Sequence, residues 1–120
     1  MKDEAVFKIL PAENWHAACV AGVFTGSGID LEDGYIHFST ASQVAETAAL
    51  HFRHQQGLML LEIAVARLAC SGLQLVWEES RGGALFPHLY ANLPVETVVA
   101  ATPMPLDQDG IPIIPAAVTA

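Results

Sequence analysis

Runs of apolar residues, separated by glycines, prolines and acidic clusters, divide the chain into short predicted strands and helices. Strands are predicted over residues 5–10, 35–39, 58–66, 73–77 and 95–101. Two helices are predicted: residues 15–21, ended by Gly22, and about fifteen residues after Thr40, ended by Gly57. One domain of 120 residues with this order of elements indicates an α+β fold that combines small mixed or antiparallel sheets with two helices.

The predicted strand 35–39 has an apolar face and a polar face. Alternation places Ile36 and Phe38 toward the core, and Tyr35, His37 and Ser39 together on the opposite side. Side chains on the same face of a strand lie about 7 Å apart, close enough for one ligand to touch several of them. The strand therefore predicts one wall of a binding groove.

The end of this strand leads into the N-terminus of the second predicted helix. Free backbone N–H groups and the helix dipole favour an anion there, so His37, Ser39 and Thr40 are candidates for holding a phosphate. Thr40 followed by Gln43 also fits a capping box, in which the hydroxyls only cap the helix and His37 satisfies a buried carbonyl. Both interpretations fit the sequence.

Residues 78–90 are unusually polar for so apolar a chain and are predicted to form a functional loop. Four of their side chains are candidates to join His37 around one cleft: Glu78, Arg81, His88 and Tyr90. Arg81 would hold a carboxylate or phosphate with two parallel hydrogen bonds, and His88 or Glu78 would act as acid or base. In the alternative, Glu78 or Glu79 pairs with Arg81 and only maintains the loop shape.

The charge balance narrows the classes of partner. Thirteen acidic residues against five lysines and arginines give a formal net charge of −8, which makes nucleic acid an unlikely ligand. The apolar stretch 58–66 contains Glu62 and is far shorter than the roughly twenty residues of a membrane helix. Because the first residues also lack an export signal, the sequence predicts a cytoplasmic protein that does not enter a membrane.

Packing expectations complete the predicted fold. Trp15, Cys19 and Val20 share one face of the first helix and are expected to point inward, and Cys19 and Cys70 are expected to be buried thiols. Prolines at positions 105, 112 and 115 prevent a continuous helix at the C-terminus. We therefore predict a single domain over residues 1–103 and an extended tail over 104–120, lying on the surface or on a neighbouring subunit.

The sequence gives no specific indication of a metal site. His51 and His54 stand three residues apart on the second predicted helix, and His37, His88 and Glu78 could complete a nitrogen-rich site, but this spacing is non-specific. The glycine-rich phosphate loops and the serine-hydrolase elbow are also absent from the sequence. No metal ligand is therefore assigned.

Two motifs, DGYIHFST at 33–40 and LFPHLY at 85–90, make the first hundred residues or so similar to the family called domain of unknown function 952. The fold of that family is thought similar to that of ADP-ribosyltransferases. Residues 35–39 also resemble a strand of the RNA 2′-phosphotransferases, which use NAD. The resemblance implies a cleft between two small sheets that binds NAD, ADP-ribose or another phosphorylated small molecule. The histidine-glycine-threonine motif of those enzymes is missing, since the first strand reads Phe7-Lys8-Ile9.

Two functional hypotheses follow. In the first, an ADP-ribosyltransferase-like cleft carries both catalytic and ligand-binding side chains: His37, Glu78 and His88 as the catalytic set, and Tyr35, Ser39, Thr40, Arg81 and Tyr90 as the substrate and anion-binding set. In the second, the domain has lost the transferase reaction and acts as a ligand sensor or a protein-interaction module. The high apolar content would also allow a homodimer.

Overall fold

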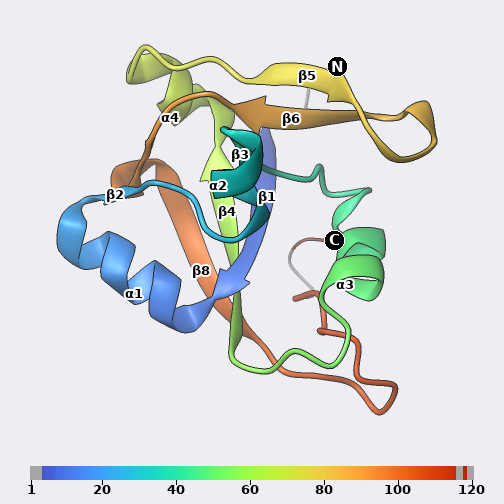
Figure 1. The fold of residues 1–120 in the computed structure, drawn as a ribbon. Helices are drawn as coiled ribbons and strands as arrows, with labels where there is room; N and C mark the ends of the chain where they lie inside the picture. The colour runs from blue at the N-terminus through green and yellow to red at the C-terminus, as the bar shows by residue number, and fades with distance from the viewer. Residues whose placement is uncertain (1–3, 116–117, 119–120) are drawn as a thin grey trace.

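The structure is a computed structural model that describes residues 4–115 and 118, apart from the side chain of Arg81. Within these residues, three antiparallel sheets and four α-helices make up this α+β domain (Figure 1). The central sheet has the order β1–β4–β8, formed by Ala5–Pro11, Leu58–Ala64 and Val98–Met104. The other two sheets are β3–β6–β5, formed by Ile36–His37, Leu85–Leu89 and Val76–Glu79, and β2–β7, formed by Val23–Phe24 and Leu93–Pro94.

The central sheet is covered on both faces. Val6 and Leu10 of β1 belong to one apolar cluster, whereas the alternate residues Phe7 and Ile9 belong to a second one. β4 follows the same alternation and is buried along nearly its whole length, as its near-continuous apolar sequence predicts. In Figure 1, helix α1 (Ala12–Ala21) lies beside one face of this sheet and α3 (Val44–His51) beside the other.

Two short helices were not predicted. Residues 29–33 form α2 (Ile29–Asp33) within a segment whose glycines and acids indicate a loop, and residues 65–70 form α4 (Val65–Cys70) where the strand was expected to continue. An unbroken apolar run cannot show by periodicity where a strand becomes a helix, so the expected end of β4 at residue 66 was two residues late. The expectation of two helices is therefore too low.

The inward face of α1 was predicted incorrectly. Ala18 is the buried residue of this helix, and Trp15, one turn earlier, packs partly against the core. Val20 is 92% exposed, and Cys19 and Cys70 are both exposed. Because positions three apart share a helix face, contact through Trp15 and Ala18 turns residues 19 and 20 toward solvent.

The helix after Thr40 is shorter than expected. Residues 41–43 form turns, and α3 runs only from Val44 to His51. The side chain of Gln43 accepts a hydrogen bond from the backbone N–H of Thr40 at 3.0 Å, which is the glutamine half of the predicted capping box. The apolar side chains of Val44 and Ala48 are buried against the second cluster.

Residues 78–90 do not form a loop. β5 and β6 pair as an antiparallel hairpin that the short 3-10 helix η1 (Arg81–Gly83) closes. Glycine, proline and charged residues lower the strand propensity of the segment, but cross-strand pairing and burial override it. The last predicted strand is also displaced, because residues 95–97 form the 3-10 helix η2 (Val95–Thr97) and β8 begins at Val98.

The chain after Met104 packs onto the domain. Leu106 and Pro112 form a bridge around a turn, Pro112 is buried, and Ile114 and Val118 pack against the second cluster. The rest of the predicted tail, residues 116–117 and 119–120, lies outside the described residues. Among the described helices, none combines the length and the apolar character that crossing a membrane requires.

Candidate functional site

The sheet β3–β6–β5 gathers the polar aromatic residues on one face. In the β3–β6 pair, Ile36 stands opposite Leu89 and His37 opposite His88. Opposite residues of an antiparallel pair share a face, so Ile36 and Leu89 enter the core while the two histidines lie on the other side. Tyr35 stacks there at ring-centroid distances of 4.5 Å from His37, 4.3 Å from His88 and 4.9 Å from Tyr90.

This face continues into a cavity of about 650 Å³. The cavity wall is formed by β1, the segment before α2, β3, α3 and the β5–β6 hairpin. Its apolar lining includes the rings of Phe7, Phe38, Phe52 and Phe86; its polar lining includes Lys8, Tyr35, His37, Ser39, His51, Glu79 and His88. An apolar cavity with a few convergent polar groups is the usual form of a small-molecule site.

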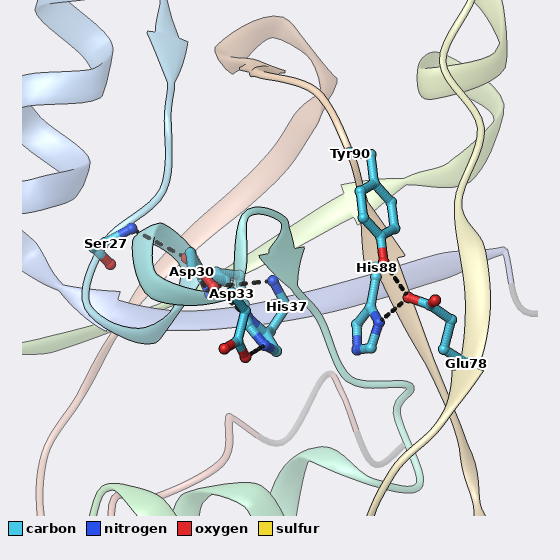
Figure 2. Close-up of polar contacts among 8 residues, drawn as sticks. Ser27, Asp30, Asp33, His37, Glu78, His88 and Tyr90 are labelled. Atoms are coloured by element: carbon cyan, nitrogen blue, oxygen red, sulfur yellow. Dashed lines mark hydrogen bonds and ion pairs between the residues drawn. The ribbon is translucent and has the colours of Figure 1, made fainter.

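His88 is held by a carboxylate at the wall of this cavity. Its Nδ1–H donates to Oε1 of Glu78 at 2.7 Å, and the hydroxyl of Tyr90 donates to the same oxygen at 2.8 Å (Figure 2). The histidine is only 4% exposed, and within the described part of the chain its Nε2 has no hydrogen-bond partner. Because the described residues contain no fully buried side-chain nitrogen that lacks a hydrogen bond, this Nε2 keeps some exposed surface, and His88 lines the cavity.

His37 has very different surroundings. Its Nδ1 lies 2.7 Å from Oδ1 of Asp30, its Nε2 lies 3.0 Å from Oδ2 of Asp33, and its backbone N–H also donates to Asp30 (Figure 2). A histidine can donate from both ring nitrogens only in its protonated form. With both nitrogens facing carboxylates, His37 is held in place and has no free nitrogen for a ligand.

A buried ion pair anchors Asp30. Nζ of Lys8 lies 2.9 Å from Oδ1 and 2.8 Å from Oδ2 of this carboxylate, and both side chains are buried. Burial alone would raise the pKa of Asp30, but the hydrogen bond from His37 and the charge of Lys8 outweigh it and lower that pKa to about 2. Burial lowers the pKa of Lys8, and the attraction of Asp30 opposes that effect.

Hydrogen bonding also shifts the pKa values of Glu78 and Tyr90. The hydrogen bonds from His88 and Tyr90 lower the pKa of Glu78, which keeps this carboxylate ionised. The same bond to Glu78 raises the pKa of Tyr90 to about 12. Glu78 is thus an anionic acceptor that orients one histidine and one tyrosine.

The predicted site residues are only partly brought together. Five of them form one contiguous group: Tyr35, His37, Glu78, His88 and Tyr90. The hydroxyl of Ser39 faces the cavity wall but bonds Thr47, while Thr40 is buried and bonds Ser42. The Thr40 amide that was a candidate for an anion is occupied by Gln43. The Arg81 side chain lies outside the described part of the chain, and Glu78 pairs with His88 and Tyr90.

Sequence reasoning missed the groups that hold His37. Asp30 and Asp33 lie in a segment whose glycines and acids indicate a loop, and Lys8 lies in the first predicted strand. The one usable signal in the sequence was the position of Asp33, four residues before His37 within the first motif. In the structure, these two side chains do contact each other. Asp30 reaches His37 through the turn of α2, which the sequence did not reveal.

The histidines of α3 do not converge with those of the sheet. His51 lines the cavity, whereas the backbone of His54 has a positive φ of 68° and its N–H donates to the carbonyl of Gly110 at 2.6 Å. Among residues 4–115 and 118, no group of three histidine, cysteine, aspartate or glutamate side chains has a metal-binding arrangement.

The chain is similar in sequence and fold to solved structures of another protein. The crystal structure of protein CC0527 from Caulobacter crescentus is 44% identical, covers 97% of this chain and 99% of its own, and has a TM-score of 0.89. The solution NMR structure of CC0527 is 46% identical over 91% of both chains, with a TM-score of 0.79. No curated protein matches. The model of a family described as "Protein of unknown function (DUF952)" matches residues 9–101, and the chain therefore belongs to this family.

Proposed function

We propose that the protein binds a small organic molecule in the 650 Å³ cavity and that His88, oriented by Glu78, exchanges a proton with it. One observation supports this proposal. Nε2 of the nearly buried His88 has no hydrogen-bond partner among the described residues, while its Nδ1 is held by the carboxylate of Glu78. Donation from Nδ1–H to Glu78 leaves the lone pair of Nε2 directed to the ligand. A positioned histidine of this kind serves as a general base or acid.

The ligand class comes from the resemblance to ADP-ribosyltransferases. A nucleotide such as NAD or ADP-ribose, or another phosphorylated small molecule, has flat rings that suit the phenylalanine-rich lining. Its phosphates need a cation, and the cavity-lining Lys8 is already neutralised by Asp30. We therefore propose Arg81, in the turn that closes the hairpin, as the candidate cation for the phosphates.

A non-catalytic ligand sensor is the second candidate. His37 has both ring nitrogens held by carboxylates, and the histidine-glycine-threonine motif is absent, so in the facing pair of His37 and His88 only His88 has a nitrogen left for a ligand. Such a cavity can bind a ligand without transforming it. Binding and turnover must therefore be measured separately.

The test is a thermal-shift titration of the wild type with NAD, ADP-ribose, simple nucleotides and inorganic phosphate. A ligand at about a hundred times its dissociation constant should add about 2.7 kcal/mol of stability. We expect His88→Gln and Arg81→Gln to weaken the shift, and His16→Gln, an exposed substitution on α1, to preserve it. Nicotinamide release with NAD would indicate the enzyme, whereas a shift without product would indicate the sensor. A shift retained in full by His88→Gln would overturn the role of this histidine.

A further inference from the structure

The edge of the cavity beside His88 has a donor and acceptor pattern that restricts what can bind there. We call the residues around this histidine the carboxylate corner: Tyr35 and His88, which line the cavity, and the partly exposed Glu78 and Tyr90 beside them. His88 uses its Nδ1–H and Tyr90 uses its O–H to reach Glu78, so neither hydrogen is left for a ligand. Two of the remaining groups, Nε2 of His88 and the Glu78 carboxylate, accept hydrogen bonds, and the hydroxyl of Tyr35 can accept or donate. A ligand group that meets Nε2 of His88 must therefore be a hydrogen-bond donor.

The charges around the corner favour the same kind of group. Lys8 is the permanent cation among the described side chains of the cavity wall, and Asp30 neutralises it. Asp33 and Glu78 add two further carboxylates beside His37 and His88. An incoming anion would be repelled by these like charges.

The aromatic rings add a third preference. The ring centroids of Tyr35 and Tyr90 lie 4.9 Å apart, and Tyr90 is more than half exposed, so the ring of Tyr90 is accessible from solvent. The faces of aromatic rings attract cations, whereas they offer little to anions. The adjacent carboxylate of Glu78 strengthens this preference for positive charge.

We propose that the carboxylate corner recognises a hydrogen-bond donor attached to an apolar ring, and that it discriminates against carboxylates. The donor is a protonated amine or another N–H or O–H group that is uncharged or positively charged. This inference rests on the proposed function, since it names the group that meets Nε2 of His88. It concerns only the part of the ligand that meets His88. Any phosphate must lie away from this corner.

Three probes of similar size test this preference: benzylamine, benzyl alcohol and benzoate each carry one substituent on a phenyl ring. Their affinities are measured by NMR titration of the uniformly ¹⁵N-labelled full chain, which follows the imidazole nitrogens of His88 directly. A charge-assisted hydrogen bond is worth roughly a factor of ten in affinity or more. We expect benzylamine to bind about tenfold more tightly than benzoate, with benzyl alcohol between them, and to move the Nε2 resonance of His88.

Two variants with the same change of charge localise the effect. Glu78→Gln removes the anionic acceptor of the corner, so benzylamine should lose most of its advantage over benzyl alcohol. Glu96→Gln, an exposed substitution on η2 away from the cavity wall, should leave that advantage unchanged. Equal losses in both variants would mean that general attraction by the acidic protein, rather than this corner, selects the amine, and would overturn the inference.

The remaining outcomes separate the inference from the proposed function. Benzoate binding as tightly as benzylamine while moving the His88 resonance would overturn the preference but leave the cavity and its histidine intact. Nucleotide binding without response to any of the three probes would also overturn the preference alone. If neither nucleotides nor probes perturb His88, both proposals fail.

Discussion

At the scale of single residues, the two histidines of the site differ in what their nitrogens can do. They face each other across the β3–β6 pair with ring centroids 5.2 Å apart. His37 is enclosed by Asp30 and Asp33, whereas His88 is held at one nitrogen only. The first is thus part of the support of the site, and the second is available for a ligand.

The carboxylate of Asp30 is expected to be a major determinant of stability. Asp30→Ala leaves the buried charge of Lys8 without a partner, and breaking a buried pair in this way costs about 3–5 kcal/mol. Urea unfolding measures the loss. Asp33→Ala, which removes a more exposed contact, should cost less than about 1 kcal/mol. Adding Lys8→Met to Asp30→Ala should restore part of the stability; no recovery would contradict the unpaired charge as the cause.

Asp30 also predicts how stability depends on pH. Its pKa is about 2 in the folded protein against an ordinary value of 3.8, so its contribution is fully present above about pH 4. That contribution disappears as the pH falls from about 4 to about 2. For a buried carboxyl, a pKa change of this size corresponds to a loss of about 2 kcal/mol. Urea midpoints measured across this pH range should fall less steeply with decreasing pH for Asp30→Asn than for the wild type. An equal slope in both proteins would refute the assignment of this pH dependence to Asp30.

The hydrogen bond from Tyr90 to Glu78 can be detected in the ionisation of the phenol. In a Tyr35→Phe background Tyr90 is the only tyrosine, and its pKa of about 12 keeps it protonated at pH 11. Glu78→Gln removes the anionic acceptor, so the pKa should move toward its ordinary value near 10 and tyrosinate absorbance should appear by pH 11. Glu79→Gln, beside it on β5, should preserve the late titration. Circular dichroism verifies that each variant remains folded.

At the scale of elements, the faces of individual strands were predictable but their partners were not. Alternation correctly placed Ile36 and Phe38 in the core, because side-chain direction in a strand depends on local geometry alone. Whether residues 85–89 form a strand depends on pairing with residues distant in the sequence. The short helix α2 depends likewise on turns at Gly28 and Gly34, both with positive φ, and therefore the environment of His37 could not be derived from the sequence.

One side chain links α3 to the sheet that carries the site. The amide oxygen of Gln43 accepts from Thr40 N–H at 3.0 Å, and its amide nitrogen donates to the carbonyl of Leu85 at 2.8 Å. Gln43→Ala removes both bonds and should cost about 1–2 kcal/mol in urea unfolding. Gln56→Ala, the same change at an exposed position before β4, should cost less than about 0.5 kcal/mol. Equal costs would mean that the link contributes nothing.

At the scale of the whole molecule, the charge of −8 is confined to a domain of 41 × 35 × 31 Å. At 0.01 M salt the screening length is about 30 Å, so charges across the domain repel one another, whereas at 0.1 M it is about 10 Å. This repulsion opposes the compact state. The buried Lys8–Asp30 pair is shielded from dissolved ions, so its contribution to stability should change little with salt concentration.

Thermal stability should therefore rise with salt. Between 0.01 and 0.5 M NaCl we expect the Tm to increase by several degrees, because relief of about 1 kcal/mol shifts the Tm of a domain of this size by roughly 4 °C or more. KCl should act equally, since screening does not distinguish the two cations. A double variant, Glu13→Gln with Glu96→Gln, removes two exposed negative charges and should show a smaller rise. A Tm that falls as salt is added would mean that favourable surface ion pairs outweigh the net repulsion.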